Sequence, residues 1–219
     1  MIRYRTPALL IVLAAPLAAR DSSGPPARGI DLLALIDLKQ DSVRGEWTLE
    51  KGVLTCTRKM KAARVVIPYL PPEEYDLLIV AERTEGTDAL TTGLASGDRQ
   101  FVHGVDGYTI DGQCLSGFEM LDNKAGRENE SRRDGPVFTN GKPSTLRYFI
   151  RKGHIRLVAD EKEVLDWKGD FKRLAFRPDY RVPPAGVLSV GAWASVFRIS
   201  RMTLHPRSDG GRLLREKPK

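Results

Sequence analysis

Apolar and polar residues alternate in short runs along most of the chain, and Gly, Pro, Asp and Asn separate these runs at close intervals. Alternation with a period of two is typical of strands that bury one face. The clearest passage is residues 144–167, which holds three such runs with turn signals at Lys152-Gly153 and at Asp160-Glu161. We therefore predict a three-stranded antiparallel meander over this passage.

The same strand pattern recurs in five other segments that are rich in Val, Ile, Leu, Thr and aromatic residues: 46–56, 75–83, 88–96, 99–107 and 187–206. The first of them has two short apolar runs around Lys51-Gly52, which predicts a hairpin. In the last, Phe197 and Ile199 lie in one register, whereas Met202 and Leu204 lie in the other. A strand that changes register in this way contains a bulge, so we expect one between these two pairs.

Helical patterns are confined to residues 30–41 and 169–176, each long enough for a turn or two. Many strands with almost no helix predict an all-β fold, in which two antiparallel sheets pack face to face as a jelly-roll sandwich. The 219 residues, of which 41% are hydrophobic, are sufficient for one core of that size. A single sandwich domain is the simplest organisation.

The first twenty residues have the layout of a secretory signal. Arg3 and Arg5 precede an apolar run from Ala8 to Ala19, which is too short to span a bilayer. We predict a signal peptide over 1–19, a linker over 20–28, the β-sandwich over 29–206 and a basic flexible tail over 207–219. The protein is then exported to the periplasm, the cell envelope or the extracellular space, with no transmembrane helix after cleavage. An uncleaved segment would tether the domain to the membrane instead.

The formal net charge of +7 is concentrated at the two ends of the chain. Two arginines in the signal contribute +2 and the tail from 207 contributes +3, which leaves +2 for everything between. A nearly balanced domain lacks the basic footprint that binds phosphate backbones, so we predict no nucleic-acid partner.

The chain contains two cysteines, Cys56 and Cys114. An exported protein meets an oxidising compartment in which such a pair can form a disulfide. Both residues lie near apolar stretches, which favours two separate buried thiols, and the paired alternative stays open.

Several segments, in order, resemble the concanavalin A-like lectin/glucanase superfamily and, more narrowly, its bacterial 3-keto-disaccharide hydrolase branch: 45–54, 75–83, 117–123, 140–167 and 188–204. The branch shares a Trp-containing hairpin, a Gly-aromatic-Glu strand, a long meander and a final Phe-Arg strand. The resemblance implies a secreted concanavalin A-like sandwich. The chain departs from the branch at Leu121, where a Gln is usual, at Asp160-Glu161, where Asn-Gly is usual, and at Ile199-Ser200, where Asn-Ile is usual.

Two carboxylates, Glu119 and Asp122, stand close together in the run SGFEMLDN. Residues three apart on a regular strand point to opposite faces, so they do not form the closely facing pair that a retaining glycosidase needs. If Glu119 is catalytic, its partner comes from another strand or loop, where His103, Asp106 and Asp111 are available. The alternative is a polar residue on a solvated concave face.

The other ligand-binding candidates are polar loop residues and aromatic residues. Asn129 and Arg132 lie in the polar loop 124–135 and could hydrogen-bond a sugar, although a simple solvated loop fits as well. Tyr108 and Trp193 are of the type that stacks on sugar rings, although such residues also fill cores. Trp47 and Trp167 lie in apolar hairpin strands, so we assign them to the core.

A metal ion is not predicted. Asp106 and Asp111 stand beside glycines, and such loops can offer oxygens to calcium, but no full ligand set is visible. Calcium is therefore an alternative only.

We predict an exported sandwich that binds carbohydrate or another extracellular ligand on its concave face, without clear catalytic geometry. The enzyme alternative is a glycosidase-like hydrolase or lyase that acts through Glu119. A structural or protein-interaction module that binds a component of the cell envelope is the third hypothesis, and fold alone does not separate the three.

Overall fold

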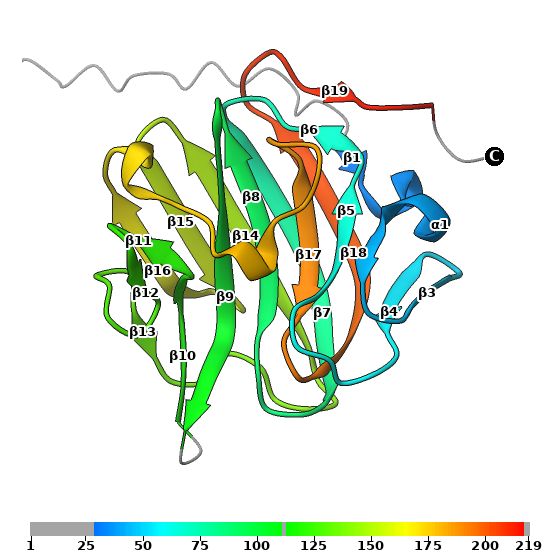
Figure 1. Ribbon diagram of the computed structural model, residues 1–219, viewed down its shortest axis with the longest axis horizontal. Helices are drawn as coiled ribbons and strands as arrows, with labels where there is room; N and C mark the ends of the chain where they lie inside the picture. The colour runs from blue at the N-terminus through cyan, green and yellow to red at the C-terminus, as the bar shows by residue number, and fades with distance from the viewer. Residues whose placement is uncertain (1–28, 111–112, 217–219) are drawn as a thin grey trace, which may run out of the picture.

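The protein is described here by a computed structural model, which describes residues 29–110 and 113–216 (Figure 1). The predicted signal peptide, the linker to residue 28 and Asp111 lie outside the described residues. Two large antiparallel sheets pack face to face and enclose the core. The predicted all-β sandwich is therefore confirmed.

The eight-stranded sheet has the order β16 (Lys162–Lys168), β15 (His154–Ala159), β14 (Pro143–Arg151), β7 (Tyr75–Glu85), β18 (Val196–Pro206), β4 (Val53–Cys56) and β3 (Trp47–Glu50), with β1 (Ile30–Asp31) paired to β18. The seven-stranded sheet, which faces the viewer in Figure 1, has the order β13 (Arg133–Asp134), β10 (Gln113–Phe118), β9 (Arg99–Ile110), β8 (Leu90–Ser96), β17 (Leu188–Ala192), β5 (Ala63–Ile67) and β2 (Ser42–Arg44).

The small elements are two short strand pairs and four single turns of helix. The pairs are β11 (Met120–Leu121) with β12 (Lys124–Ala125), and β6 (Tyr69–Leu70) with β19 (Arg212–Leu213). The helices are η1 (Leu33–Leu35), α1 (Leu38–Asp41), η2 (Phe171–Arg173) and η3 (Pro178–Tyr180). Three of them fall in the two stretches with a helical pattern, η3 begins two residues after the second stretch, and each is about one turn long.

The core forms because alternate residues of the long strands face the opposite sheet. In β7, Tyr75, Leu77, Ile79 and Ala81 are buried while the residues between them are half-exposed. The same alternation holds in β14, which confirms the predicted face of the meander. At a hydrophobic gain of about 25 cal/mol per Å² of buried apolar area, this shared face supplies the main stabilisation of the sandwich.

Both faces of the seven-stranded sheet are covered at its middle. Every residue of β8 and of β17 is buried, and not only alternate ones. Residues 169–187, coloured yellow to orange in Figure 1, run across the outer face of this sheet. In this segment Tyr180 packs against Ala62 and Val102, and Val182 packs against Val66. This cover creates the pockets of the outer face.

The predicted turns and bulge are present. The two strands of the first hairpin pair around Lys51-Gly52, and both residues have a positive φ. The turn at Asp160-Glu161 also has a positive φ at both residues, as a two-residue hairpin turn requires, and the Asp160 carboxylate accepts from the Thr145 amide at 2.7 Å. The register of β18 against β7 shifts between Ile199 and Arg201, where the sequence predicts a bulge.

The sequence predicts a basic flexible tail over 207–219, of which the structure describes the residues to Glu216. The described part, to Glu216, lies against the sandwich: β19 pairs with β6, and Leu214 packs against the buried cluster of Val66, Val182 and Val187. Arg215 forms an ion pair with Asp41, whose side chain is buried. Basic composition alone suggested a solvated end, but this arginine has a buried acidic partner that is distant in the sequence.

Both cysteines are free thiols in the structure, Cys56 buried and Cys114 half-buried. Trp167 is buried in the core, and Trp47 is half-buried and packs against it. None of the helices in the described ranges is long and apolar enough to span a membrane.

Candidate functional site

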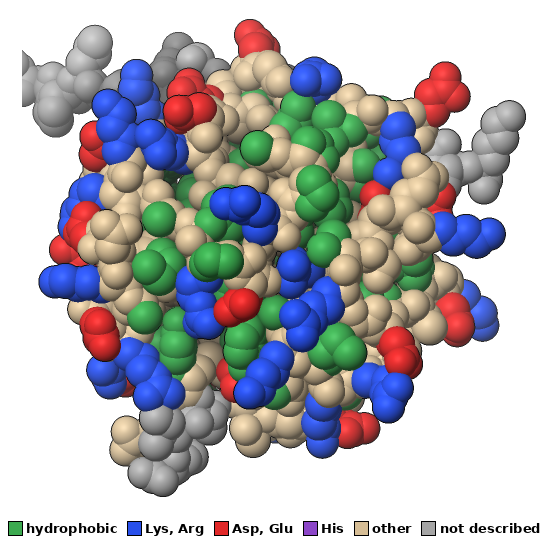
Figure 2. All heavy atoms as spheres, in the orientation of Figure 1, with side chains coloured by type: hydrophobic (Ala, Val, Ile, Leu, Met, Phe, Trp, Pro, Cys, Tyr) green, Lys and Arg blue, Asp and Glu red, His purple; other side chains and the backbone are tan. Residues whose placement is uncertain are grey.

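A pocket of about 170 Å³ opens on the outer face of the seven-stranded sheet. Its charged lining residues are Asp88, Glu119, Arg127 and Arg177, and its aromatic lining residues are Tyr108, Tyr180 and Trp193. We call it the Glu119 pocket. Figure 2 shows this side of the molecule, where Lys and Arg side chains gather among hydrophobic ones across the middle and lower part.

An irregularity in β9 and β10 creates this pocket. Gly104 and Gly107 both face it, because a Cβ added to either would contact Ala89. In a regular strand, residues three apart would face opposite sides. The period is broken where Asp106 and Tyr108 take positive φ values of 61° and 55° and where the register against β10 shifts. This bulge places Gly107 beside Tyr108 in the lining of the pocket.

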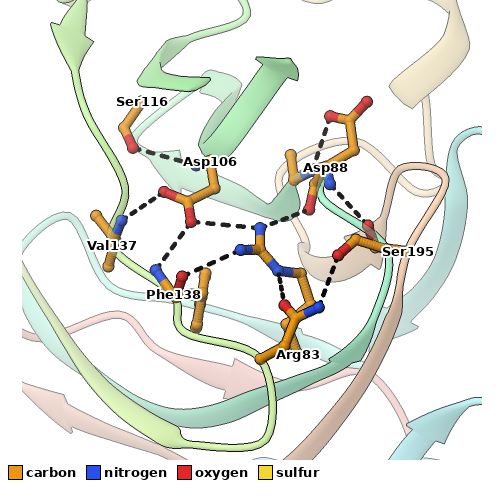
Figure 3. A network of polar contacts seen from close by, with 10 residues as sticks. Arg83, Asp88, Asp106, Ser116, Val137, Phe138 and Ser195 are labelled. Carbon is orange, nitrogen blue, oxygen red and sulfur yellow. Dashed lines mark hydrogen bonds and ion pairs between the residues drawn. The ribbon is translucent and has the colours of Figure 1, made fainter. Parts of the chain in front are cut away.

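A buried polar network holds the bulge in place (Figure 3). The Asp106 carboxylate accepts from the amides of Val137 (2.7 Å) and Phe138 (2.8 Å) and lies 3.3 Å from the Arg83 guanidinium. Arg83 also donates to the carbonyl oxygens of Phe138 (3.1 Å) and Asp88 (3.5 Å). Both charged side chains are almost fully buried. Arg83 therefore connects the bulge of β9 to Asp88 at the edge of the pocket.

The Glu119 carboxylate lies at the bottom of the pocket, and its side chain is 3% exposed. Its Oε2 accepts from the Tyr108 hydroxyl at 2.7 Å and from Arg177 Nη1 at 3.4 Å, and Tyr180 also hydrogen-bonds to the carboxylate. Burial raises the pKa of Glu119, while the hydrogen bond from Tyr108 and the charge of Arg177 oppose that shift. Gly104 makes room for this side chain, since a Cβ there would lie 2.9 Å from Oε1.

Aromatic rings and guanidinium groups form the walls. The Arg177 guanidinium lies 5.7 Å from the Tyr180 ring centroid and 5.5 Å from that of Trp193, and the two rings are 5.7 Å apart. The Arg127 guanidinium lies 5.2 Å from the Tyr108 ring centroid. These distances are typical of cation–π contacts, which fix the orientation of both partners.

The tyrosine hydroxyls of the pocket act as neutral donors. Burial and the nearby Glu119 charge raise the pKa of Tyr108 to about 12. Burial and the same carboxylate also raise the pKa of Tyr180. Both hydroxyls therefore keep their protons at neutral pH and can donate to a carboxylate or to a ligand oxygen.

Asp88 is a second carboxylate in this pocket. Burial raises its pKa, its Oδ1 accepts from the Ala89 amide at 2.8 Å, and its own amide donates to Ser195 Oγ at 2.8 Å. Asp88 is half-buried, whereas Glu119 is almost completely buried. Asp88 is thus the more accessible of the two carboxylates.

Three of the residues predicted to bind ligand meet in this pocket: Tyr108, Glu119 and Trp193. His103 lies on the core side of β9, where Nδ1 is 3.1 Å from the Tyr148 hydroxyl. Asp106 faces Arg83 in the buried network. Neither of these two residues lines the pocket.

The other predicted residues lie outside the pocket. Asp122 is exposed in the turn between β11 and β12 and pairs with Arg173 at 2.6 Å, which lowers the pKa of its carboxyl group. The buried Asn129 side chain bonds to the carbonyl oxygens of Phe118 (2.9 Å) and Lys124 (3.2 Å), so it holds its own loop together. Arg132 is exposed and bonds to Asp134 at 2.8 Å.

The sequence analysis missed Asp88, Arg127, Arg177 and Tyr180. Asp88 stands at the start of a predicted strand, and Arg127 lies in the polar loop 124–135. Arg177 and Tyr180 lie in a later segment that has no strand pattern. The Arg-Pro-Asp-Tyr run that forms η3 is the one local signal, because a proline can begin a helical turn. Nothing local indicates which sheet that turn covers.

Two of the buried carboxylates in and beside the pocket, Glu119 and Asp106, already have cationic or hydroxyl partners. Across 29–110 and 113–216, no group of three or more His, Cys, Asp or Glu side chains is arranged to hold a metal ion. Glu119 faces Tyr108 and Arg177, and Asp106 faces Arg83. The described arrangement therefore fits hydrogen bonding to a ligand better than it fits metal coordination.

No family model and no curated protein matches the sequence. Solved structures with a similar fold include the apo Crh5 transglycosylase, with a TM-score of 0.55 and 14% identity over 86% of this chain and 90% of that one. The Ca²⁺-bound exoplasmic/lumenal domain of VIP36 has a TM-score of 0.51 and 12% identity over 76% and 83% of the two chains. For the carbohydrate-binding module CBM66 from Bacillus subtilis the values are 0.50 and 11% over 75% and 93%. These likenesses, together with the two packed sheets, show that the chain has the concanavalin A-like β-sandwich fold.

Proposed function

We propose that this chain is an exported carbohydrate-binding domain that holds a sugar ring in the Glu119 pocket. The observation that carries the proposal is a buried carboxylate with aromatic walls around it on one face of the sandwich. Aromatic rings bind the apolar face of a sugar, and charged or hydroxyl groups bind its hydroxyls. Trp193, Tyr108 and Asp88 supply these two kinds of contact.

The size of the pocket favours a ligand no larger than one sugar ring. Its volume of about 170 Å³ is below the range of about 300–1,000 Å³ that is usual for small-molecule sites. The ligand is then a single ring, such as the end of a glycan chain. The sequence analysis predicted that the ligand binds on a concave face, and we propose that this face is the outer face of the seven-stranded sheet.

The similar structures support the proposal at the level of the fold. One of them is named a carbohydrate-binding module and another a transglycosylase. The signal-like N-terminus supports export to the periplasm, the cell envelope or the extracellular space. The narrower likeness to the 3-keto-disaccharide hydrolase branch stays a prediction.

The test is a glycan array probed with the full chain and with Trp193→Ala. Loss of the Trp193 ring should weaken binding by about tenfold, since one aromatic contact contributes about 0.5–1.5 kcal/mol beyond its buried area. The matched control is Phe149→Ala, which removes a half-buried aromatic residue from β14 in the other sheet. Equal binding by both variants would place the ligand elsewhere, and binding to no glycan would contradict the proposal.

Calcium is not required in this proposal. The carboxylates of Glu119 and Asp106 are neutralised by Arg177 and Arg83, so calcium would have to displace a guanidinium. Binding should be the same in calcium and in a chelator. Affinity that falls when calcium is removed would show that another part of the chain provides a metal site.

A second candidate function is glycosidase-like hydrolysis, and the presence of two carboxyl groups in one pocket favours it. Burial raises the pKa of both Asp88 and Glu119, and a carboxyl group with a raised pKa is suited to act as a general acid. Any glycan that binds should be incubated with the wild type and with Asp88→Asn. Turnover that Asp88→Asn abolishes without weakening binding would establish the enzyme, with Asp88 as the accessible acid.

A third candidate is a structural module that binds a component of the cell envelope. Such a role would be favoured by a broad exposed apolar patch. Among the described residues, the large hydrophobic side chains that are exposed are Val43 and Leu213, in separate short strands. We therefore rank this role below sugar binding.

A further inference from the structure

A second pocket, of about 790 Å³, lies on the outer face of the same sheet. Its charged lining residues are Arg64, Arg99, Arg181 and Asp98, and Phe176 contributes an aromatic surface. We call it the arginine pocket. Among the described residues that line it, three guanidinium groups therefore face one carboxylate.

The arginine pocket and the Glu119 pocket share a wall. Residues 174–176, 178 and 181–185 line the arginine pocket, whereas Arg177 and Tyr180 of the same segment line the Glu119 pocket. Arg177 and Pro178 are neighbours in the chain and line one pocket each, so both pockets lie against the same stretch of chain. A ligand that fills both pockets has to be longer than one ring and to pass this stretch.

The guanidinium groups of this pocket are only weakly neutralised. Arg64 uses Nε and Nη1 on the carbonyl oxygens of Arg181 (3.3 Å) and Ala62 (2.9 Å). Burial is the main reason why the pKa of Arg64 is lowered; the charge of Arg44 adds to this shift and that of Asp179 opposes it. Arg181 lines the same pocket and is exposed.

Arg99 provides the second observation. Its Nε is buried and has no hydrogen-bond partner in the described part of the chain. It forms only a long ion pair, at 3.5 Å, with the Asp98 carboxylate, and the side chains of Arg99 and Asp98 are 39% and 87% exposed. A buried N–H without an acceptor carries a desolvation cost that an anionic ligand oxygen would remove.

We infer that the arginine pocket binds the carboxylate or sulfate group of an acidic oligosaccharide whose neighbouring ring occupies the Glu119 pocket. The planar guanidinium fork matches the two oxygens of such a group. Phe176 supplies an apolar surface for the ring that carries the charge, which a bare phosphate polymer would not use. The inference rests on the proposed function, because it assigns the class of sugar that the same face binds.

The test is an array that carries neutral oligosaccharides, their uronate-containing counterparts and sulfated oligosaccharides. It is probed with the full chain, with Arg99→Gln/Arg181→Gln and with a double control that removes the same charge from the eight-stranded sheet, Arg156→Gln/Arg201→Gln. The wild type should prefer the uronate or sulfated member of each bound pair. The Arg99/Arg181 variant should lose about tenfold or more of that preference and keep its binding to neutral sugars. The control should retain the preference.

Three results would overturn the inference. The wild type could bind neutral glycans as tightly as acidic ones, the preference could survive in the Arg99/Arg181 variant, or both double variants could lose it equally. Inorganic polyphosphate that competes as well as the acidic glycan would show a general anion site instead of a sugar site. Failure of the proposed function differs from all of these, because then no glycan binds at all.

Discussion

The Tyr108 hydroxyl donates a 2.7 Å hydrogen bond to the buried Glu119 carboxylate, from a neighbouring strand whose register shifts twice before it reaches this point. The bond connects the bulge of β9 with the residue that follows β10, and both side chains line the pocket. It depends on two features: the positive φ of Tyr108 and the space above Gly104.

Removal of this donor should destabilise the protein. Tyr108→Phe leaves a buried acceptor with one fewer donor, which costs about 1–3 kcal/mol of unfolding free energy. Urea denaturation of Tyr108→Phe, Glu119→Gln and the double variant measures the coupling between the two side chains, for which we expect about 1 kcal/mol or more. Strictly additive losses would mean that the hydrogen bond does not contribute to stability.

The buried ion pair of Arg83 and Asp106 should dominate the stability of the pocket edge. Arg83→Met leaves the Asp106 carboxylate buried without its cation, and such losses cost about 3–5 kcal/mol. The matched control is Arg198→Met, which breaks an exposed pair with Glu82 at 3.5 Å and should cost less than about 1 kcal/mol. Similar unfolding free energies for both variants would contradict this account.

His103 should make the fold sensitive to acid. Burial lowers the pKa of His103 to about 3, from 6.5, and its Nε2 has no hydrogen-bond partner among the described residues. The unfolded chain therefore takes up this proton below pH 6.5 while the folded chain does not. The free energy of unfolding is therefore unaffected by His103 above pH 6.5, and it falls by about 1.4 kcal/mol per pH unit between pH 6.5 and pH 3.

The measurement is the unfolding free energy at pH 7 and at pH 4 for the wild type and for His103→Gln. The wild type should lose about 3 kcal/mol more than the variant over this range. Tyr148→Phe is the control, since it removes the hydrogen-bond partner of the imidazole and keeps the titrating group. Parallel losses in the wild type and His103→Gln would show that His103 titrates normally.

The C-terminal segment should belong to the folded unit. Arg215→Gln leaves the Asp41 carboxylate, whose side chain is 4% exposed, without its guanidinium partner. We expect a loss of about 1.5–3 kcal/mol, as for hydrogen bonds to charged groups. Arg212→Gln is the control, because that side chain is exposed in β19. A thermal or urea midpoint unchanged by Arg215→Gln would support the flexible tail of the sequence prediction.

The strands, the hairpins and the bulge of the last strand were predictable because their signals are local. Alternation in 75–83 and 144–167 predicts which residues face inward. The change of register after Ile199 can be read from the spacing of the apolar residues on either side of it. Period-two patterning is a property of each strand by itself, so it needs no knowledge of the partner strand. The fold class followed from the number of such runs.

The composition of the pocket depended on contacts between distant segments. Glu119 meets Tyr108 eleven residues away and Arg177 fifty-eight residues away, and the second of these comes from a loop that covers the sheet. The bulge at Asp106 also places Gly104 and Gly107, three residues apart, on the same side of β9, which simple alternation cannot give. The sequence by itself determined which segments form strands and which residues line the core. Only the tertiary structure decided which side chains share a pocket, because strand order, loop position and a single bulge place residues that are far apart along the chain.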